Sequence, residues 1–328
     1  MSLETGGILE RAGVLVGFHT DDPITDSRLL NRSAALGVRA GMSRKGALEA
    51  LTINGAKILD LDKRIGSLEV GKDADVVLWS GILSRSIPKY WRPGSTERWC
   101  STAPIPRIAS GPRGLRRGAR PRHRGLLRSR RGGPMRRALE LAAVLLGFAA
   151  AAPAQVAIHG QTVHTMAGEP IRDGIVVIRD GKIAAVGPAA TTKVPEGFKV
   201  LEADVVTPGL IDAHTVVGLT GYLNQAHDQE QVEKSAPIQP ELRAIDAYDP
   251  DERLVEWIRG FGITTIHTGH GPLALVSGQT MIAKTWGKTP EEAAIVPLAM
   301  VAATLGDSAI DKTPAPARRR SRCCARSC

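Results

Sequence analysis

The chain has little cysteine, few aromatic residues and, over one long stretch, no acidic residue. Its 328 residues include four cysteines and 4% aromatic side chains, and no two cysteines form a CxxC pair. Paired CxxC units are the usual sign of a structural zinc site, and a disulfide framework needs an ordered scaffold. The cysteines therefore give no reason to expect either. They are Cys100, Cys323, Cys324 and Cys328.

The net charge of +10 is unevenly distributed. Residues 101–134 contain ten Arg, no Lys and no acidic residue, so the rest of the chain has a net charge of zero (10 − 10). Residues 313–328 carry five more Arg, again without an acidic residue. A nucleic-acid-binding domain usually carries its basic residues on a folded face with aromatic residues or a recognisable motif. No specific nucleic-acid partner is expected, although RNA binding by an Arg-rich segment at 101–134 is kept as an alternative.

Long apolar runs are also lacking. The most apolar segment, 138–151, follows the basic start MRR and precedes the small-x-small sequence APA. This order is typical of a secretion signal peptide, but the run is shorter than the about 20 apolar residues of a transmembrane helix. A buried or surface-bound Ala/Leu helix is the alternative. Membrane association is expected only through 135–154. A protein translated from Met135 would be periplasmic or secreted, and the location of the whole chain stays open.

The first part of the chain has the pattern of α/β structure. Residues 14–18 form an apolar run that ends in HTDDP at 19–23. A buried parallel strand has this pattern, since it becomes polar where it leaves the sheet. Helices are expected at 25–40 and, capped by Ser43, at 44–58.

A strand at 76–79 ends this part, and residues 82–134 show no helical or strand period. Pro, Arg, Gly and Ser dominate there, as in disordered segments. Regular patterns return downstream, where RDGK at 179–182 indicates a two-residue hairpin turn. The four strands expected here are 156–159, 175–179, 182–186 and 199–203.

Two further strands end in histidine-containing exits. They are expected at 207–213 and, after a helix at 251–260, at 262–267. Alternating strands and helices favour parallel α/β units.

Four motifs resemble those of the amidohydrolase superfamily, nearest its imidazolonepropionase-like members. The run VTPGLIDAH at 206–214 resembles the family's first barrel strand, and the strands ending in GKIAAVG at 181–187 resemble its N-terminal β-sandwich. GSLEVGKDADVV at 66–77 is similar to the C-terminal return to that sandwich, and LEALTINGAK at 48–57 to the penultimate helix. Such motifs identify a fold more surely than a substrate.

The resemblance implies a (β/α)8 barrel with its active site at the C-terminal mouth, joined to a β-sandwich made from both chain ends. It also implies a divalent metal, with Zn2+ as the first choice. In this chain the C-terminal piece of one member precedes the N-terminal piece of another. The fold class is therefore α/β plus β, an incomplete barrel with a composite β-sandwich in permuted order. The joining of two neighbouring hydrolase genes would explain the order of the pieces. Translation of GC-rich DNA in the wrong reading frame would explain the Arg-rich stretches.

The resemblance also implies how the strands are arranged. Because strand 8 neighbours strand 1 in a closed barrel, it implies that the strands at 14–18, 207–213 and 262–267 lie side by side and parallel. Asp21 and His214 would then lie at the same edge of the sheet. The composite sandwich implies that residues 65–79 pair with residues 156–205.

The expected domains follow from the same motifs. In order they are a C-terminal barrel piece (1–64), C-terminal sandwich strands (65–80), a disordered linker (81–134), a signal-like segment (135–154), an N-terminal sandwich (155–206), an N-terminal barrel piece (207–312) and a disordered tail (313–328).

Two site residues can be carried over from the family. TDDP at 20–23 matches the exit of the eighth barrel strand, so the resemblance makes Asp21 a metal ligand and the catalytic proton shuttle. The alternative is that Asp21 or Asp22 caps the next helix. His214 matches the first histidine of the family's His-x-His pair and would be a metal ligand.

The second histidine of that pair is absent, because Val216 occupies its position. A purely structural role for His214 is therefore an alternative. His267 and His270 are possible substitute ligands at the next strand exit. The Lys or Glu of the fourth barrel strand and the histidines of the fifth and sixth have no counterpart in this chain.

The resemblance predicts a metal-dependent hydrolase of carbon–nitrogen bonds other than peptide bonds, incomplete in this chain. Its partner would be a small molecule, either a cyclic amide or a peptide-like compound. The alternative is a catalytically inactive fusion or frameshifted fragment with a folded sandwich and a partial barrel.

Overall fold

The computed structural model describes residues 3–21, 26–80, 155–221, 225–272 and 274–305. The described residues before and after segment 81–154 belong to one compact unit. The predicted linker, signal-like segment and C-terminal tail lie outside the described residues. None of the described helices combines the length and apolar character that crossing a bilayer requires.

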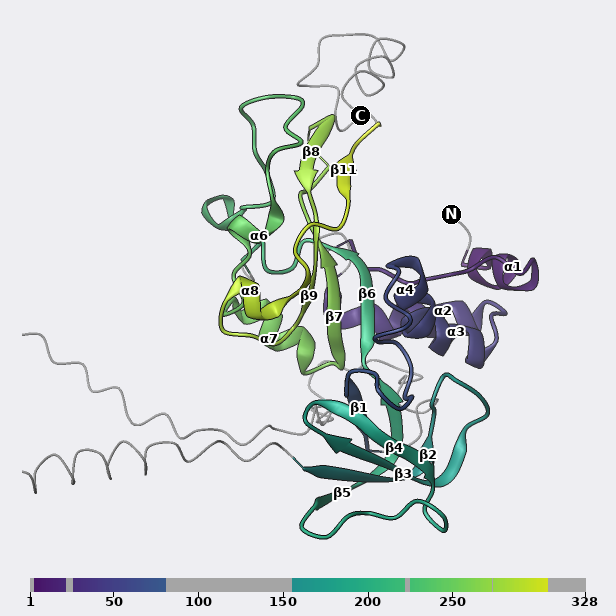
Figure 1. The fold of residues 1–328 in the computed structure, drawn as a ribbon. Coiled ribbons are helices and arrows are strands. Elements are labelled where there is room, and N and C mark those ends of the chain that lie inside the picture. Colours follow the sequence, from purple (N-terminus) through teal and green to yellow (C-terminus); the bar gives the residue numbers. More distant parts are fainter. Residues whose placement is uncertain (1–2, 22–25, 81–154, 222–224, 273, 306–328) are drawn as a thin grey trace, which may run out of the picture. The chain divides into compact units, whose positions relative to one another are not determined.

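The largest sheet has five strands in the order β1-β5-β2-β3-β4 (Figure 1). Its strands are β1 (Val76–Trp79), β2 (Val156–Val163), β3 (Ile171–Arg179), β4 (Lys182–Pro188) and β5 (Lys199–Pro208). The predicted hairpin between β3 and β4 is confirmed, with Asp180 and Gly181 at φ 52° and 72°. Positive φ at both central residues is the requirement of a type I′ turn, which Asp-Gly meets readily.

β1 joins the upstream part of the chain to this sheet. It pairs antiparallel with β5, from Val76 opposite Pro208 to Trp79 opposite Val205. The indole N–H of Trp79 donates to the Thr207 hydroxyl at 2.9 Å. The predicted pairing of the upstream strand with the downstream sheet is confirmed, although its partners lie at the C-terminal end of β5.

A second sheet has four strands in the order β10-β9-β7-β6. β6 and β7 are parallel, as predicted from their polar exits. β9, a strand that the sequence analysis did not predict, is antiparallel to β7. Among the described residues, β8 lies between β7 and β9 in the chain, and no crossover helix connects them. The strands are β6 (Leu210–Thr215), β7 (Ile263–Thr268), β9 (Met281–Lys284) and β10 (Ala294–Val296).

A third sheet pairs β8 (Val276–Gln279) with β11 (Val301–Ala303). Among the described residues the sheets thus have five, four and two strands, and none closes into an eight-stranded ring.

The strand predicted at 14–18 is wrong, since residues 14–20 are not part of any regular ladder. Two backbone hydrogen bonds connect this segment to β6: Ala213 N–H to Phe18 O at 3.4 Å, and Asp21 N–H to His214 O at 3.0 Å. Between them, the Thr20 N–H donates to the Asp212 carboxylate at 3.0 Å. The Asp212 carboxylate thus accepts the hydrogen bond that a backbone carbonyl of β6 would accept in a regular ladder. The pairing of residues 14–20 with β6 is therefore interrupted.

The helices α3 and α4 lie beside β6, and α7 lies beside β7 (Figure 1). Ser43 caps α3 as predicted, because its hydroxyl accepts from Gly46 N–H at 2.9 Å. The single helix expected at 44–58 is broken at Thr52, where ψ is −98°. The helices are α1 (Thr5–Arg11), α2 (Leu30–Arg39), α3 (Arg44–Leu51), α4 (Ile53–Ile58), α6 (Ala244–Ala247), α7 (Arg253–Arg259) and α8 (Pro290–Ala293), with 3-10 turns η1 (Ser27–Leu29) and η2 (Ala226–Asp228).

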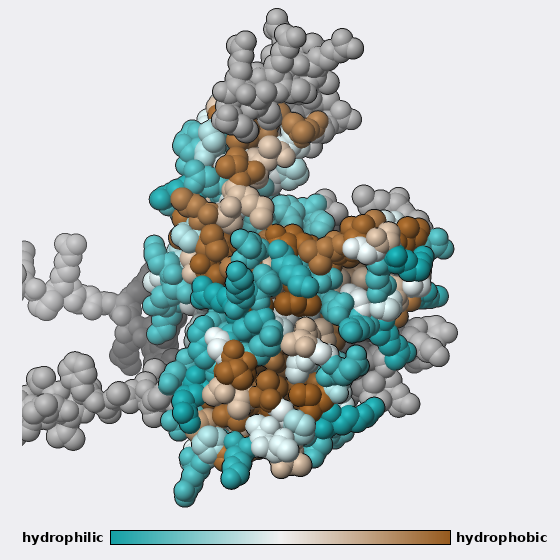
Figure 2. Space-filling view, turned by 45° about the vertical axis from the view of Figure 1, so that its right-hand side comes forward, coloured by the Kyte–Doolittle hydropathy of each residue, from teal (hydrophilic) through white to brown (hydrophobic). Residues whose placement is uncertain are grey.

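The main hydrophobic cluster combines side chains from both sides of segment 81–154, including Leu51 and Trp79 with Leu210, Ile258 and Ile263. Apolar side chains also reach the surface, as Figure 2 shows on one face. Around α1, Ile8, Val14 and Leu15 are about half exposed.

Candidate functional site

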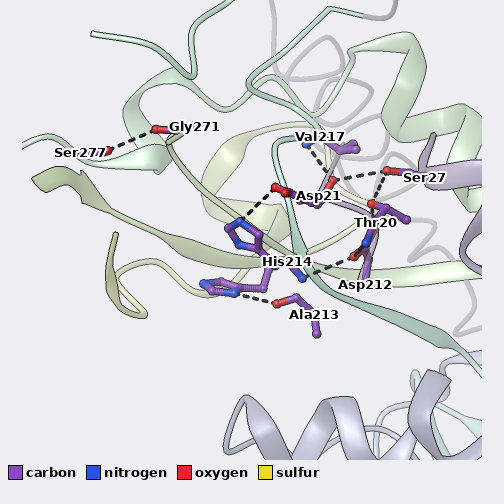
Figure 3. A network of polar contacts seen from close by, with 11 residues as sticks. Thr20, Asp21, Ser27, Asp212, Ala213, His214, Val217, Gly271 and Ser277 are labelled. Carbon is purple, nitrogen blue, oxygen red and sulfur yellow. Dashed lines mark hydrogen bonds and ion pairs between the residues drawn. The ribbon is translucent and has the colours of Figure 1, made fainter. Parts of the chain in front are cut away.

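Asp21 and His214 meet at the C-terminal end of β6 (Figure 3). The Nε2 atom of His214 lies 3.5 Å from Oδ1 of Asp21, and each side chain is 40% exposed. The sequence prediction that these two residues share one edge of the sheet is confirmed. The alternative in which Asp21 caps the next helix is wrong, because the cap of η1 is Asp26, whose carboxylate accepts from Arg28 N–H. Asp22, the other residue of that alternative, lies outside the described residues.

The backbone at Asp21 is left-handed, with φ at 52°. Asp adopts this conformation more readily than most residues, because its short polar side chain can bond locally. The Asp21 N–H donates to the carbonyl of His214 itself. The backbone of His214 therefore holds the backbone of Asp21, so the contact between the two residues does not depend on their exposed side chains alone.

The imidazole of His214 has a lowered pKa. Burial is the main cause; Asp21 opposes it by raising the pKa, and His19 adds to it. The ring of His19 stands edge-on to that of His214, with centroids 5.8 Å apart. At neutral pH His214 is therefore uncharged beside a carboxylate, an arrangement in which protons can be exchanged.

Asp212, which the sequence reasoning did not single out, is a fully buried carboxylate beneath the pair. Its Oδ1 accepts from Thr20 N–H at 3.0 Å and from His214 N–H at 3.4 Å, and its Oδ2 from the Thr20 hydroxyl at 2.5 Å. The sequence did contain one indication of this site. Asp212 lies two residues before His214, so both side chains lie on the same face of a strand.

His267 lies next to His214, with ring centroids 6.0 Å apart. Its Nδ1–H donates to the Ala213 carbonyl at 3.0 Å, and its Nε2 lies 2.8 Å from the Thr280 hydroxyl. Burial is the main cause that lowers its pKa. Both ring nitrogens are thus engaged, so His267 would have to give up a hydrogen bond to act as a ligand.

His270 is buried, with a lowered pKa caused by burial, and its Nδ1 has no hydrogen-bond partner among the described residues. It packs against Gly278, where a Cβ atom would come within 2.8 Å of its ring. No described contact links it to Asp21 or His214, and its role as a ligand stays a prediction.

The described residues do not form a complete metal centre. Val216, at the place of the missing histidine, is buried. Within the described ranges, no group of three or more His, Cys, Asp or Glu side chains is arranged to hold a metal ion. A catalytic zinc has three protein ligands and an open position. Asp21 and His214 provide two side chains of the right type, one fewer than such a site needs.

Comparison with known proteins covers part of the chain. Residues 6–108 match the model of the amidohydrolase family. A 5-methylthioadenosine/S-adenosylhomocysteine deaminase from Desulforudis audaxviator is 41% identical over 78 residues, which is 21% of this chain and 18% of that protein. An adenine deaminase from Paracoccus denitrificans is 46% identical over 66 residues, covering 19% and 11%.

Among solved structures, an amidohydrolase from Thermotoga maritima is similar with a TM-score of 0.48 and 20% identity, over 52% of this chain and 45% of that one. The chain spans less than a fifth of the length of the curated relatives named above. The family generally uses a divalent metal. The family match over residues 6–108 and these relatives support the assignment of the matched segments to the amidohydrolase superfamily.

Proposed function

We propose that the site at Asp21 and His214 belongs to a hydrolase of carbon–nitrogen bonds in small molecules. The observation that carries the proposal is the contact of 3.5 Å between these two side chains, which come from distant parts of the chain. The deaminase names of the relatives support the reaction class, since deamination by water breaks a carbon–nitrogen bond.

Asp21 is the proton-transferring residue in this proposal. Its carboxylate takes a proton from the attacking water and delivers it to the nitrogen that leaves. His214 is neutral and lies beside it, so it can orient the water or share the proton. Zn2+ stays the expected ion, with Asp21 and His214 as its ligands, but two ligands do not complete a catalytic zinc site.

The substrate class follows the same reasoning. Relatives named for adenine and methylthioadenosine favour an amino group on a purine-like ring. A cyclic amide or a peptide-like compound is the class that the motifs indicate. All of these have a planar carbon bonded to nitrogen, which water attacks in the same manner.

A non-catalytic remnant is the second candidate. It is favoured by the lack of a three-ligand group among the described residues. RNA binding through 101–134 has no support of this kind, because that segment lies outside the described residues.

We further propose that the chain joins the C-terminal piece of one amidohydrolase to the N-terminal piece of another, in permuted order. The pairing of β1 with β5 supports this, because a sandwich strand from the end of one piece completes a sheet from the beginning of the other. Nucleotide sequencing across codons 80–135 and 310–328 tests it. An intact frame without slip sites would exclude the frameshift origin.

The function is tested with the purified full-length chain. Ammonia release from adenine and methylthioadenosine, and ring opening of a cyclic amide, are measured with and without added Zn2+, together with bound metal. We expect turnover that Asp21→Asn abolishes and His214→Asn reduces. Turnover that both variants retain would refute the site. Absence of both turnover and bound metal would favour the remnant.

A further inference from the structure

We propose that Asp212 is a positioning residue that holds Asp21 against His214 by acting through Thr20. The proposal rests on the proposed function for its consequence in catalysis, but its structural part can be tested separately. Asp212 has no solvent exposure, and its carboxylate accepts the three hydrogen bonds described above (Figure 3).

These bonds reach both members of the pair. Thr20 immediately precedes Asp21, and the carboxylate fixes it twice, through its N–H and its hydroxyl. The same carboxylate accepts from the N–H of His214. One buried anion therefore determines the backbone positions on both sides of the 3.5 Å contact.

The hydroxyl groups around Asp212 form a chain with one direction. A carboxylate accepts only, so the Thr20 hydroxyl donates to Asp212. Ser27 is then the donor in its 3.0 Å contact with Thr20, and Thr215 the donor in its 3.4 Å contact with Ser27. The Val217 N–H donates in turn to the Thr215 hydroxyl at 3.4 Å. Each donor polarises the next towards the charge, which strengthens the bond that fixes Thr20.

The arrangement also explains why residues 14–20 do not continue the sheet. In a regular parallel ladder the Thr20 N–H would donate to a carbonyl of β6. Here the Asp212 side chain accepts it instead, and the backbone then turns into the left-handed conformation at Asp21. The interruption of the ladder is thus what directs the Asp21 carboxylate to His214.

Residue-resolved amide hydrogen exchange of the full-length chain tests the proposal. Asp212→Asn keeps the volume but removes the charge and replaces one acceptor by a donor. We expect the amides of Thr20, Asp21 and His214 to exchange roughly ten- to a hundredfold faster, since bonds to a charged acceptor are lost. The paired amides of β2 and β3 serve as the reference. A general loss of stability would accelerate both sets together.

Asp75→Asn is the matched control. Asp75 is another largely buried carboxylate, ion-paired with Lys284 away from the site, so its loss should not change the ratio between the two sets of amides. Thr20→Val removes the hydroxyl at similar volume, and Thr20→Ser retains it. We expect the Asp21 amide to exchange faster in Thr20→Val but not in Thr20→Ser. This pair of variants tests the proposal if Asp212→Asn does not fold.

Unchanged exchange of the three amides relative to β2 and β3, in Asp212→Asn or, failing that, in Thr20→Val, would overturn the proposal. Where the wild-type chain has turnover, Asp212→Asn should lower kcat and leave KM unchanged. A wild-type chain without turnover would refute the proposed function alone, because the exchange experiment does not depend on it.

Discussion

Replacing Trp79 by Ala tests whether the upstream strand is built into the downstream sheet. Trp79 is 6% exposed, belongs to the main hydrophobic cluster and donates to Thr207. Its ring also lies close to the backbone of Gly262, where a Cβ atom would be 3.5 Å from it. Removing such a side chain leaves a cavity and costs about 3–5 kcal/mol of unfolding free energy. The midpoint of thermal unfolding should fall by roughly 6–20 °C.

A double-mutant cycle separates the hydrogen bond from the packing. Trp79→Phe keeps most of the ring but leaves the Thr207 hydroxyl buried without its donor, which costs about 1–3 kcal/mol. Thr207→Val in the same chain removes the unsatisfied hydroxyl. The double variant should therefore lose about 1 kcal/mol less than the sum of the two single variants. Urea denaturation followed by circular dichroism measures all four proteins.

Trp286→Ala is the control, because that indole is 58% exposed and its ring contacts the guanidinium of Arg259, which lies 5.4 Å from the ring centroid. It should cost less than about 1 kcal/mol. If Trp79→Ala cost no more than this control, β1 would not be part of the sheet. The two halves of the chain would then not share this sheet.

The sequence was most informative where local chemistry determines the structure. Asp180 and Gly181 can adopt the positive φ that a tight hairpin needs, so the turn and the strands around it could be predicted. The meeting of Asp21 and His214 was predictable for a different reason. Both follow apolar runs, and the family resemblance puts these two runs side by side in a barrel, although residues 14–18 do not form a regular strand.

The parts that could not be predicted depend on contacts between distant residues. An apolar run such as 281–284 fits a parallel or an antiparallel strand equally well, and only the observed neighbour β7 decides between them. The same holds for Asp212. Its spacing from His214 gives a face of the strand, but not the Thr20 N–H and hydroxyl that it accepts from. The two hydrogen bonds between Thr20 and the Asp212 carboxylate interrupt the strand expected at 14–18.

Three further predictions follow from single contacts. Gly218→Ala should cost about 2–4 kcal/mol in urea denaturation, because φ is +85° and a Cβ atom would lie 2.2 Å from the Tyr248 ring; an unchanged midpoint would contradict this. Lys284→Met should cost about 3–5 kcal/mol, since it leaves the Asp75 carboxylate without its cation, and adding Asp75→Asn should recover part of the loss. His214→Asn should reduce the loss of stability on acidification. Burial lowers the pKa of His214 in the folded chain, so below about pH 6.5 the unfolded chain binds more protons and stability falls as the pH falls. The unfolding free energy, measured between pH 7 and pH 5, should therefore decline less steeply in this variant than in the wild type. Parallel curves for the two proteins would show that His214 has the same pKa in the folded and the unfolded chain, which would contradict the prediction.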